Sequence, residues 1–125
     1  MSGTIRRLPD GELTVMQAVW QCEAPVSRSA LEEKLLPEHP MAHTTLLTLL
    51  SRLAEKGFIA TEKAGRANCY TPLVTQEAYL ASQSRRFVDQ LFGGNMSLFA
   101  SALCDSGLSK QELAQLRQLL EEDAL

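Results

Sequence analysis

Short hydroxyl side chains and one arginine gather on one side of a single amphipathic segment, residues 41–56. With a turn of about 100° per residue, a helix here places a stripe of leucines on the opposite side. Threonine and serine hydroxyls bond to base edges, the threonine methyl fits thymine, and arginine binds guanine or phosphate. The segment therefore has the chemistry of a helix that reads the major groove of DNA. The residues expected to face or flank the groove are Thr44, Thr45, Leu47, Thr48, Ser51 and Arg52.

Two other places have side chains suited to the phosphate backbone. Lys63 and Arg66 flank Gly65 in an expected hairpin turn, from which both cations can reach a neighbouring phosphate. Ser27 and Arg28 open an expected helix, whose unpaired backbone amides suit an anion. Cations on a hairpin are also common in turns that only face water. The order of the surrounding elements must therefore support this interpretation.

No group of residues has the pattern of an enzyme active site. A hydrolase or transferase needs a nucleophile with a base, or a cluster of metal ligands. Cys22, Cys69 and Cys104 are far apart, no Cys-x-x-Cys pair occurs, and neither His39 nor His43 adjoins a cysteine. We expect no catalytic residues, no metal and no cofactor, with the thiols reduced and structural. A redox- or metal-responsive thiol stays open as the alternative.

The element order around these residues is typical of a winged helix-turn-helix. Ser27 is a good N-cap, Gly57 ends the leucine-rich helix, and Gly65 centres a turn between two strands. Three helices followed directly by a β-hairpin predict a mostly α fold with a small hairpin wing. The expected elements are helices 10–22, 28–36 and 41–56 and strands 58–63 and 68–71.

A second, helical region follows the wing. Thr75 caps its first helix, Gly93-Gly94-Asn95 breaks that helix, and Ser109 with Glu112 forms a capping box for the last one. The expected helices cover 76–92, 97–104 and the residues after 109. We therefore divide the chain into a winged helix-turn-helix DNA-binding domain, residues 1–74, and a helical dimerisation region, residues 75–125.

The helical region carries more apolar side chains than three short helices can bury against one another. They form stripes that need a partner surface, which predicts a two-fold homodimer. The residues expected at that interface are Leu80, Phe87, Leu91, Leu98, Phe99, Leu103, Leu113, Leu116 and Leu120.

Composition and charge are compatible with this division. The 125 residues are 45 % hydrophobic and carry a net charge of −3. The acidity lies in residues 75–125, whereas residues 1–74 have eight basic and eight acidic side chains. No apolar run approaches the ~20 residues of a membrane helix, and no signal peptide is apparent. We expect a cytoplasmic protein without a membrane partner.

Two segments carry a resemblance to a known family. Leu13-Thr14-Val15-Met16-Gln17-Ala18-Val19-Trp20 and residues 44–59, from Thr-Thr to Lys-Gly-Phe-Ile, resemble the penicillinase-repressor family. The likeness covers about Leu8 to Leu120. It implies a winged-helix domain with a C-terminal helical dimerisation region. It also implies a dimer that represses transcription by occupying palindromic operator DNA.

The signal that releases such a repressor is not transferred by the resemblance. Antibiotic-responsive members are cleaved at an Asn-Phe bond, and the matching bond here is Ser101–Ala102. A sensor protease is thus a partner that the family suggests, but one that requires Asn-Phe would not recognise this bond. The C-terminal Cys-x-Cys cluster of the copper-responsive members is absent from the sequence. Repression is the expectation and the signal is open.

Two alternatives remain. A protein-interaction module could keep the winged fold without binding DNA, and the neutral charge of residues 1–74 favours it. A ligand-sensing winged-helix regulator would hold its effector between the DNA-binding domain and the dimerisation helices. Salt dependence separates DNA binding from the interaction module, because phosphate contacts weaken steeply as salt rises.

Overall fold

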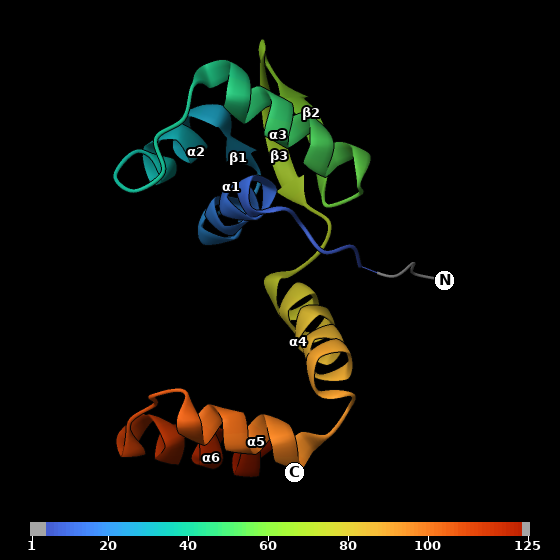
Figure 1. The fold of residues 1–125 in the computed structure, drawn as a ribbon. Coiled ribbons are helices and arrows are strands. Elements are labelled where there is room, and N and C mark those ends of the chain that lie inside the picture. Colours follow the sequence, from blue (N-terminus) through green and yellow to red (C-terminus); the bar gives the residue numbers. More distant parts are fainter. Residues whose placement is uncertain (1–4, 124–125) are drawn as a thin grey trace. The chain divides into compact units, whose positions relative to one another are not determined.

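The computed structural model describes residues 5–123 and divides into two compact units, one up to Gln83 and the other from Ser84 (Figure 1). The first unit contains three helices and a three-stranded sheet, followed by the start of a fourth helix. Its elements are α1 (Asp10–Gln21), β1 (Val26–Ser27), α2 (Arg28–Leu35), α3 (His43–Glu55), β2 (Ile59–Ala64), β3 (Ala67–Pro72) and the first two turns of α4 (Gln76–Phe92).

The three helices pack together because each has one apolar side. α1 contacts both α2 and α3, and α3 also contacts β2. Their buried side chains form one core with residues of the sheet, and the deepest of them are no more than 2 % exposed. These deepest side chains are Val15, Met16, Val19, Val26, Leu31, Leu46, Leu50, Leu53, Phe58 and Ile59.

The sheet is antiparallel, with the strand order β1-β3-β2. The hairpin pairs Lys63 with Asn68 near its tip, where Gly65 adopts φ +69°. β1 was not expected from the sequence. It has only two residues, Val26 and Ser27, and pairs with Tyr70 and Cys69 of β3. A strand of this length has no periodicity to detect, so its existence depends on the neighbouring strand.

The beginning of α4 packs into the core of the first unit. The Tyr79 ring is 4 % exposed and lies 5.7 Å from the Trp20 ring and 5.8 Å from the Phe58 ring, centroid to centroid. Its hydroxyl accepts a 2.9 Å hydrogen bond from the Leu8 amide, and the Trp20 indole donates a 2.9 Å bond to the Val74 carbonyl. The first turns of α4 are thus held by the winged unit.

The second unit has helices but almost no core of its own. It contains the end of α4, then α5 (Met96–Asp105) and α6 (Lys110–Asp123). Among residues 84–122, whose side chains are described, Val88 alone is buried. The rings of Phe87, Phe92 and Phe99 pack edge to face, with centroids 5.4–6.3 Å apart.

The expected fold class is confirmed, and so are several helix ends. Ser27 Oγ accepts from the Ala30 amide and Thr75 Oγ1 from the Ala78 amide, both at 3.1 Å. The Ser109–Glu112 capping box is closed by reciprocal bonds of 2.9 and 3.0 Å. None of the helices in residues 5–123 is long and apolar enough to cross a membrane.

Candidate nucleic-acid interface

Helix α3 is fixed to the winged unit by one side. Leu46, Leu50 and Leu53 recur at helical spacing and are at most 2 % exposed. At the C-terminal end, Lys56 Nζ donates a 2.5 Å hydrogen bond to Glu12 Oε1, and this carboxylate is buried near the start of α1. The helix is therefore held by its leucine side along its length and by an ion pair at its end.

The other side of α3 faces solvent. Of the side chains expected to face the groove, all are exposed except Leu47, which is half-buried. The Thr48 hydroxyl donates a 2.9 Å bond to the Thr44 carbonyl, so its methyl group and oxygen lone pairs remain for an outside contact. The structure thus brings Thr44, Thr45, Thr48, Ser51 and Arg52 together on one accessible helix surface.

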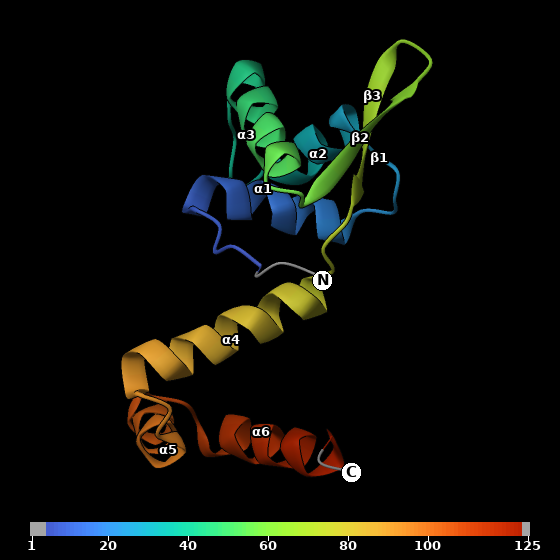
Figure 2. The same ribbon diagram turned by 90° about the vertical axis from the view of Figure 1, so that its right-hand side faces the viewer.

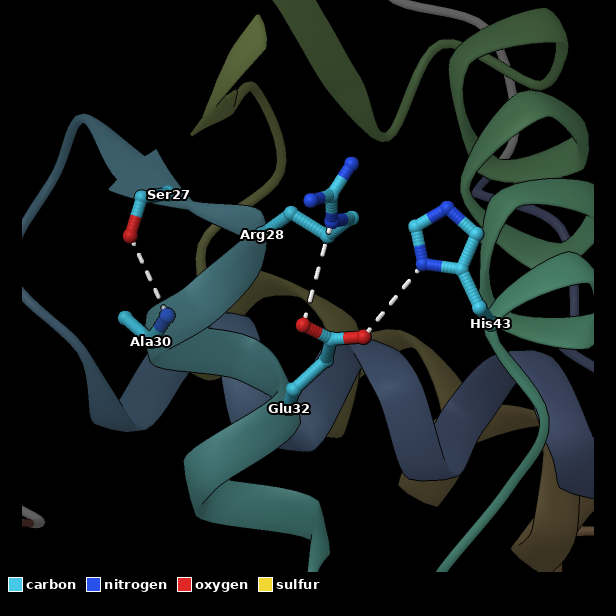
Figure 3. Close-up of polar contacts among 5 residues, drawn as sticks. All are labelled: Ser27, Arg28, Ala30, Glu32 and His43. Carbon is cyan, nitrogen blue, oxygen red and sulfur yellow. Dashed lines mark hydrogen bonds and ion pairs between the residues drawn. The ribbon is translucent and has the colours of Figure 1, made fainter. Parts of the chain in front are cut away.

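The start of α2 lies next to the start of α3. Figure 3 shows Glu32 between Arg28 and His43: Arg28 Nε is 3.8 Å from Glu32 Oε1, and His43 Nδ1 is 3.4 Å from Glu32 Oε2. Ser27 is engaged as the N-cap of α2, so its hydroxyl oxygen already accepts a bond. Arg28 remains exposed despite its carboxylate partner.

The β2–β3 hairpin carries Lys63 and Arg66 at its exposed end. Figure 2 shows this hairpin extending beyond the helices of its unit. Within residues 5–122, no carboxylate forms an ion pair with Arg52, Lys63 or Arg66. These three cations have no charge partner in the described part of the chain to compete with a phosphate.

Comparison with known proteins places this arrangement in a family. The family model described as penicillinase repressor matches residues 8–122. The chain belongs to the penicillinase repressor family. It is 29 % identical over 119 residues to the penicillinase repressor of Bacillus licheniformis, covering 94 % of this chain and 92 % of that one. It is 26 % identical over 123 residues to the methicillin resistance regulatory protein MecI of Staphylococcus aureus (strain N315), with 98 % and 99 % covered.

A solved member of the penicillinase repressor family has a similar structure. It is the monomeric form of Bacillus licheniformis BlaI in complex with the blaP half-operator, with a TM-score of 0.50 and 29 % identity. The match covers 60 % of this chain and 90 % of that one. The resemblance noted in the sequence is confirmed. Members of the family are DNA-binding transcriptional repressors, so this chain is a repressor and not an enzyme.

Two side-chain contacts in this repressor were not predicted from its sequence. Glu12 and Lys56 are 44 positions apart, and Glu32 and His43 belong to different helices, so no local spacing indicates either pair. An acid inside an apolar helix stripe is the one available signal for Glu12.

The remaining polar groups add no site to the described residues. Residues 5–123 contain no group of three or more potential metal ligands. Cys22 and Cys69 are half-buried and Cys104 is exposed, all three as free thiols. In α4, the hydrogen bond and then the charge of Asp89 raise the pKa of Arg85 above its usual value. That pair lies on the exposed surface of α4.

Proposed function

We propose that this repressor is a homodimer that occupies a palindromic operator and reads it with α3. The observation that carries the proposal is the division of α3 into a buried leucine side and an accessible side of hydroxyls with Arg52. A major groove about 12 Å wide accepts one such helix. The half-operator complex of BlaI, a protein of the same winged fold, supports this use of the unit.

Phosphate contacts complete the proposed interface. The DNA backbone on either side of the groove would be contacted by two sets of residues. These are Lys63 and Arg66 on the wing, and Ser27 and Arg28 at the start of α2. Such contacts fix register and orientation without carrying sequence information. Sequence is then read by α3, through the hydroxyls and methyls of Thr44, Thr45 and Thr48.

The apolar surface of the second unit supports a second copy of the chain as the dimer partner. Six of its large apolar side chains are at least 50 % exposed in the single chain: Phe87, Leu91, Met96, Leu98, Leu119 and Leu120. A shallow hollow of about 320 Å³ on α6 is lined by Leu113, Leu116, Leu120 and the stems of Arg117 and Glu121. The proposed interface also contains Leu80, Phe99 and Leu103. Leu80 is exposed, and the other two are half-buried.

Dimerisation through the second unit would strengthen DNA binding by the first. A two-fold dimer would set two α3 helices about 34–36 Å apart, which is one turn of DNA. The second half-site then binds within the complex, which raises affinity without a new contact. Since a repressor acts on the chromosome, we place the protein in the cytoplasm.

Release would follow from any signal that separates the two copies. Ser101 and Ala102 both lie on exposed positions of α5. Cleavage of the bond between them by a sensor protease would divide the proposed dimerisation surface. A protease would first have to unwind this part of α5, since the bond lies inside a helix.

Selection from a random-sequence DNA pool tests the proposed function. We expect a palindromic duplex to be enriched, with footprints over two half-sites one helical turn apart. Its binding constant should fall steeply with salt, because each phosphate contact releases counterions. No enriched sequence, or binding that salt does not weaken, would favour the protein-interaction module instead.

A further inference from the structure

Three charged or ionisable side chains meet where α2 and α3 begin. Glu32 lies between Arg28 and His43 and faces each with a different carboxylate oxygen (Figure 3). The Arg28 and His43 side chains remain 45 % and 49 % exposed, so both stay open to a ligand. On α3 itself, the next charged residue after His43 is Arg52, about two and a half turns away. Within residues 5–122, no ion pair joins another charged side chain to these three groups.

The contact with Glu32 favours one of the two nitrogens of His43 for an outside ligand. Nδ1 faces the carboxylate, which can only accept, so the neutral ring that bonds to Glu32 has its hydrogen on Nδ1 and a lone pair on Nε2. That lone pair repels a phosphate oxygen. In the protonated ring, Nε2 becomes a donor and can bind the same oxygen. Figure 3 shows the second ring nitrogen and the outer nitrogens of Arg28 on the same side, away from the Glu32 carboxylate.

We propose that His43 is a further phosphate contact of the DNA interface, made only in its charged form, and that Glu32 positions it beside Arg28. This inference rests on the proposed function, since the phosphate is one of the operator backbone. The cluster has no net charge when His43 is neutral and one positive charge when His43 is protonated. DNA affinity should then rise as the pH falls.

The chain makes this pH dependence simple to measure. It contains two histidines, His39 and His43, and histidine is the side chain that normally titrates between about pH 8 and about pH 6. We would measure binding of the full-length protein to the selected duplex across this range at constant ionic strength. The expected gain toward low pH is up to about fivefold per bound protomer, as for one exposed ion pair.

Four variants separate the roles of the residues. His43→Gln should remove the gain at low pH, and His43→Lys, which stays charged, should bind well at both ends of the range. His39→Gln is the matched control and should keep the wild-type profile. Glu32→Ala removes the acceptor that faces Nδ1 and leaves the histidine in place. The gain at low pH should then shrink, because the ring is no longer held beside Arg28.

The duplex offers an independent test of the same contact. Replacing single phosphates with neutral methylphosphonates should reveal one position per half-site at which the wild-type pH dependence disappears. The proposal is overturned if His43→Gln keeps the pH dependence, or if His43→Lys binds as weakly as His43→Gln at about pH 8. Either result would leave the repressor function intact. Failure to bind any duplex at any pH would instead reject the proposed function itself.

Discussion

The two units of this chain use apolar residues in opposite ways. Within the first unit, leucines, valines and aromatic rings from all its elements meet in one core. Within the second, α5 and α6 also carry several large apolar side chains, yet Val88 is the one buried residue among 84–122. The first unit therefore has a hydrophobic core of its own. The second unit leaves its apolar surface exposed in the single chain, and we propose that a second copy of the chain covers it.

The number of exposed apolar side chains in the second unit indicates how much free energy a dimer partner would contribute by burying them. Burying one large apolar side chain stabilises a protein by roughly 1.5–3 kcal/mol. Six such side chains at least half exposed in each copy amount to a driving force on the order of 10 kcal/mol, before the costs of association. A surface of this kind is uncommon on a protein that remains monomeric.

A charge in the exposed apolar surface of the second unit should have the largest effect on DNA affinity. Leu98→Asp places a charge on an exposed apolar position of α5 and should give monomers. The winged unit should stay folded, because its core does not include Leu98. Binding to the full palindrome should fall by about 10²-fold or more, as the gain from effective concentration is lost. Sedimentation and binding to the selected duplex measure the two effects.

A matched control lies in the first unit. Leu36 is 63 % exposed, compared with 55 % for Leu98, and Leu36→Asp makes the same chemical change. We expect Leu36→Asp to remain dimeric. A wild-type protein that sediments as a monomer at micromolar concentration and still binds its full palindrome tightly would contradict this account of the second unit.

The first unit should instead be sensitive at its buried ion pair. Glu12→Ala leaves the Lys56 ammonium near the core without its carboxylate, and such losses cost roughly 3 kcal/mol or more. Urea unfolding at one fixed protein concentration measures the change. Glu33→Ala, at an exposed acid of α2, is the control and should change stability by about 0.5 kcal/mol or less. Equal stability of the two variants would show that the Glu12–Lys56 pair does not hold α3.

The sequence predicted most of this fold because its signals are local. The leucines of α3 fix its buried side by helical period alone, and the Ser109–Glu112 capping box marks the start of α6. What it could not predict depends on residues distant in the chain. The two residues of β1 exist as a strand only beside β3, and Tyr79 is buried only because Trp20 and Phe58 surround it.

The candidate site divides in the same way. The outward positions of α3 follow from the helical period, so the exposed hydroxyls and Arg52 were foreseen. The Glu32–His43 contact depends on how residues 36–42 bring α2 and α3 together, and no pattern in the sequence specifies that path. The Glu12–Lys56 pair likewise depends on the packing of α1 against α3.

Within the proposed interface, α3 should contribute more than the wing. Arg52→Ala should cost roughly 1–3 kcal/mol of binding without unfolding the domain, because the side chain is exposed. Thr44→Ala should reduce discrimination between the selected duplex and single-base variants. Lys110→Ala, at an exposed lysine that begins α6 and belongs to neither proposed interface, is the control and should leave the binding constant unchanged. If Arg52→Ala and Thr44→Ala are both silent, this face of α3 does not read DNA.

The wing should give the smallest effect and the one least dependent on sequence. Lys63 and Arg66 are exposed and have no carboxylate partner within residues 5–122, so both are free to meet phosphates. Replacing both with alanine should weaken selected and random duplexes by similar factors. It should also flatten the slope of log K against log salt by up to about two units, one per lost phosphate contact. A loss confined to the selected duplex would mean that the wing reads bases, and no loss would mean that it only faces water.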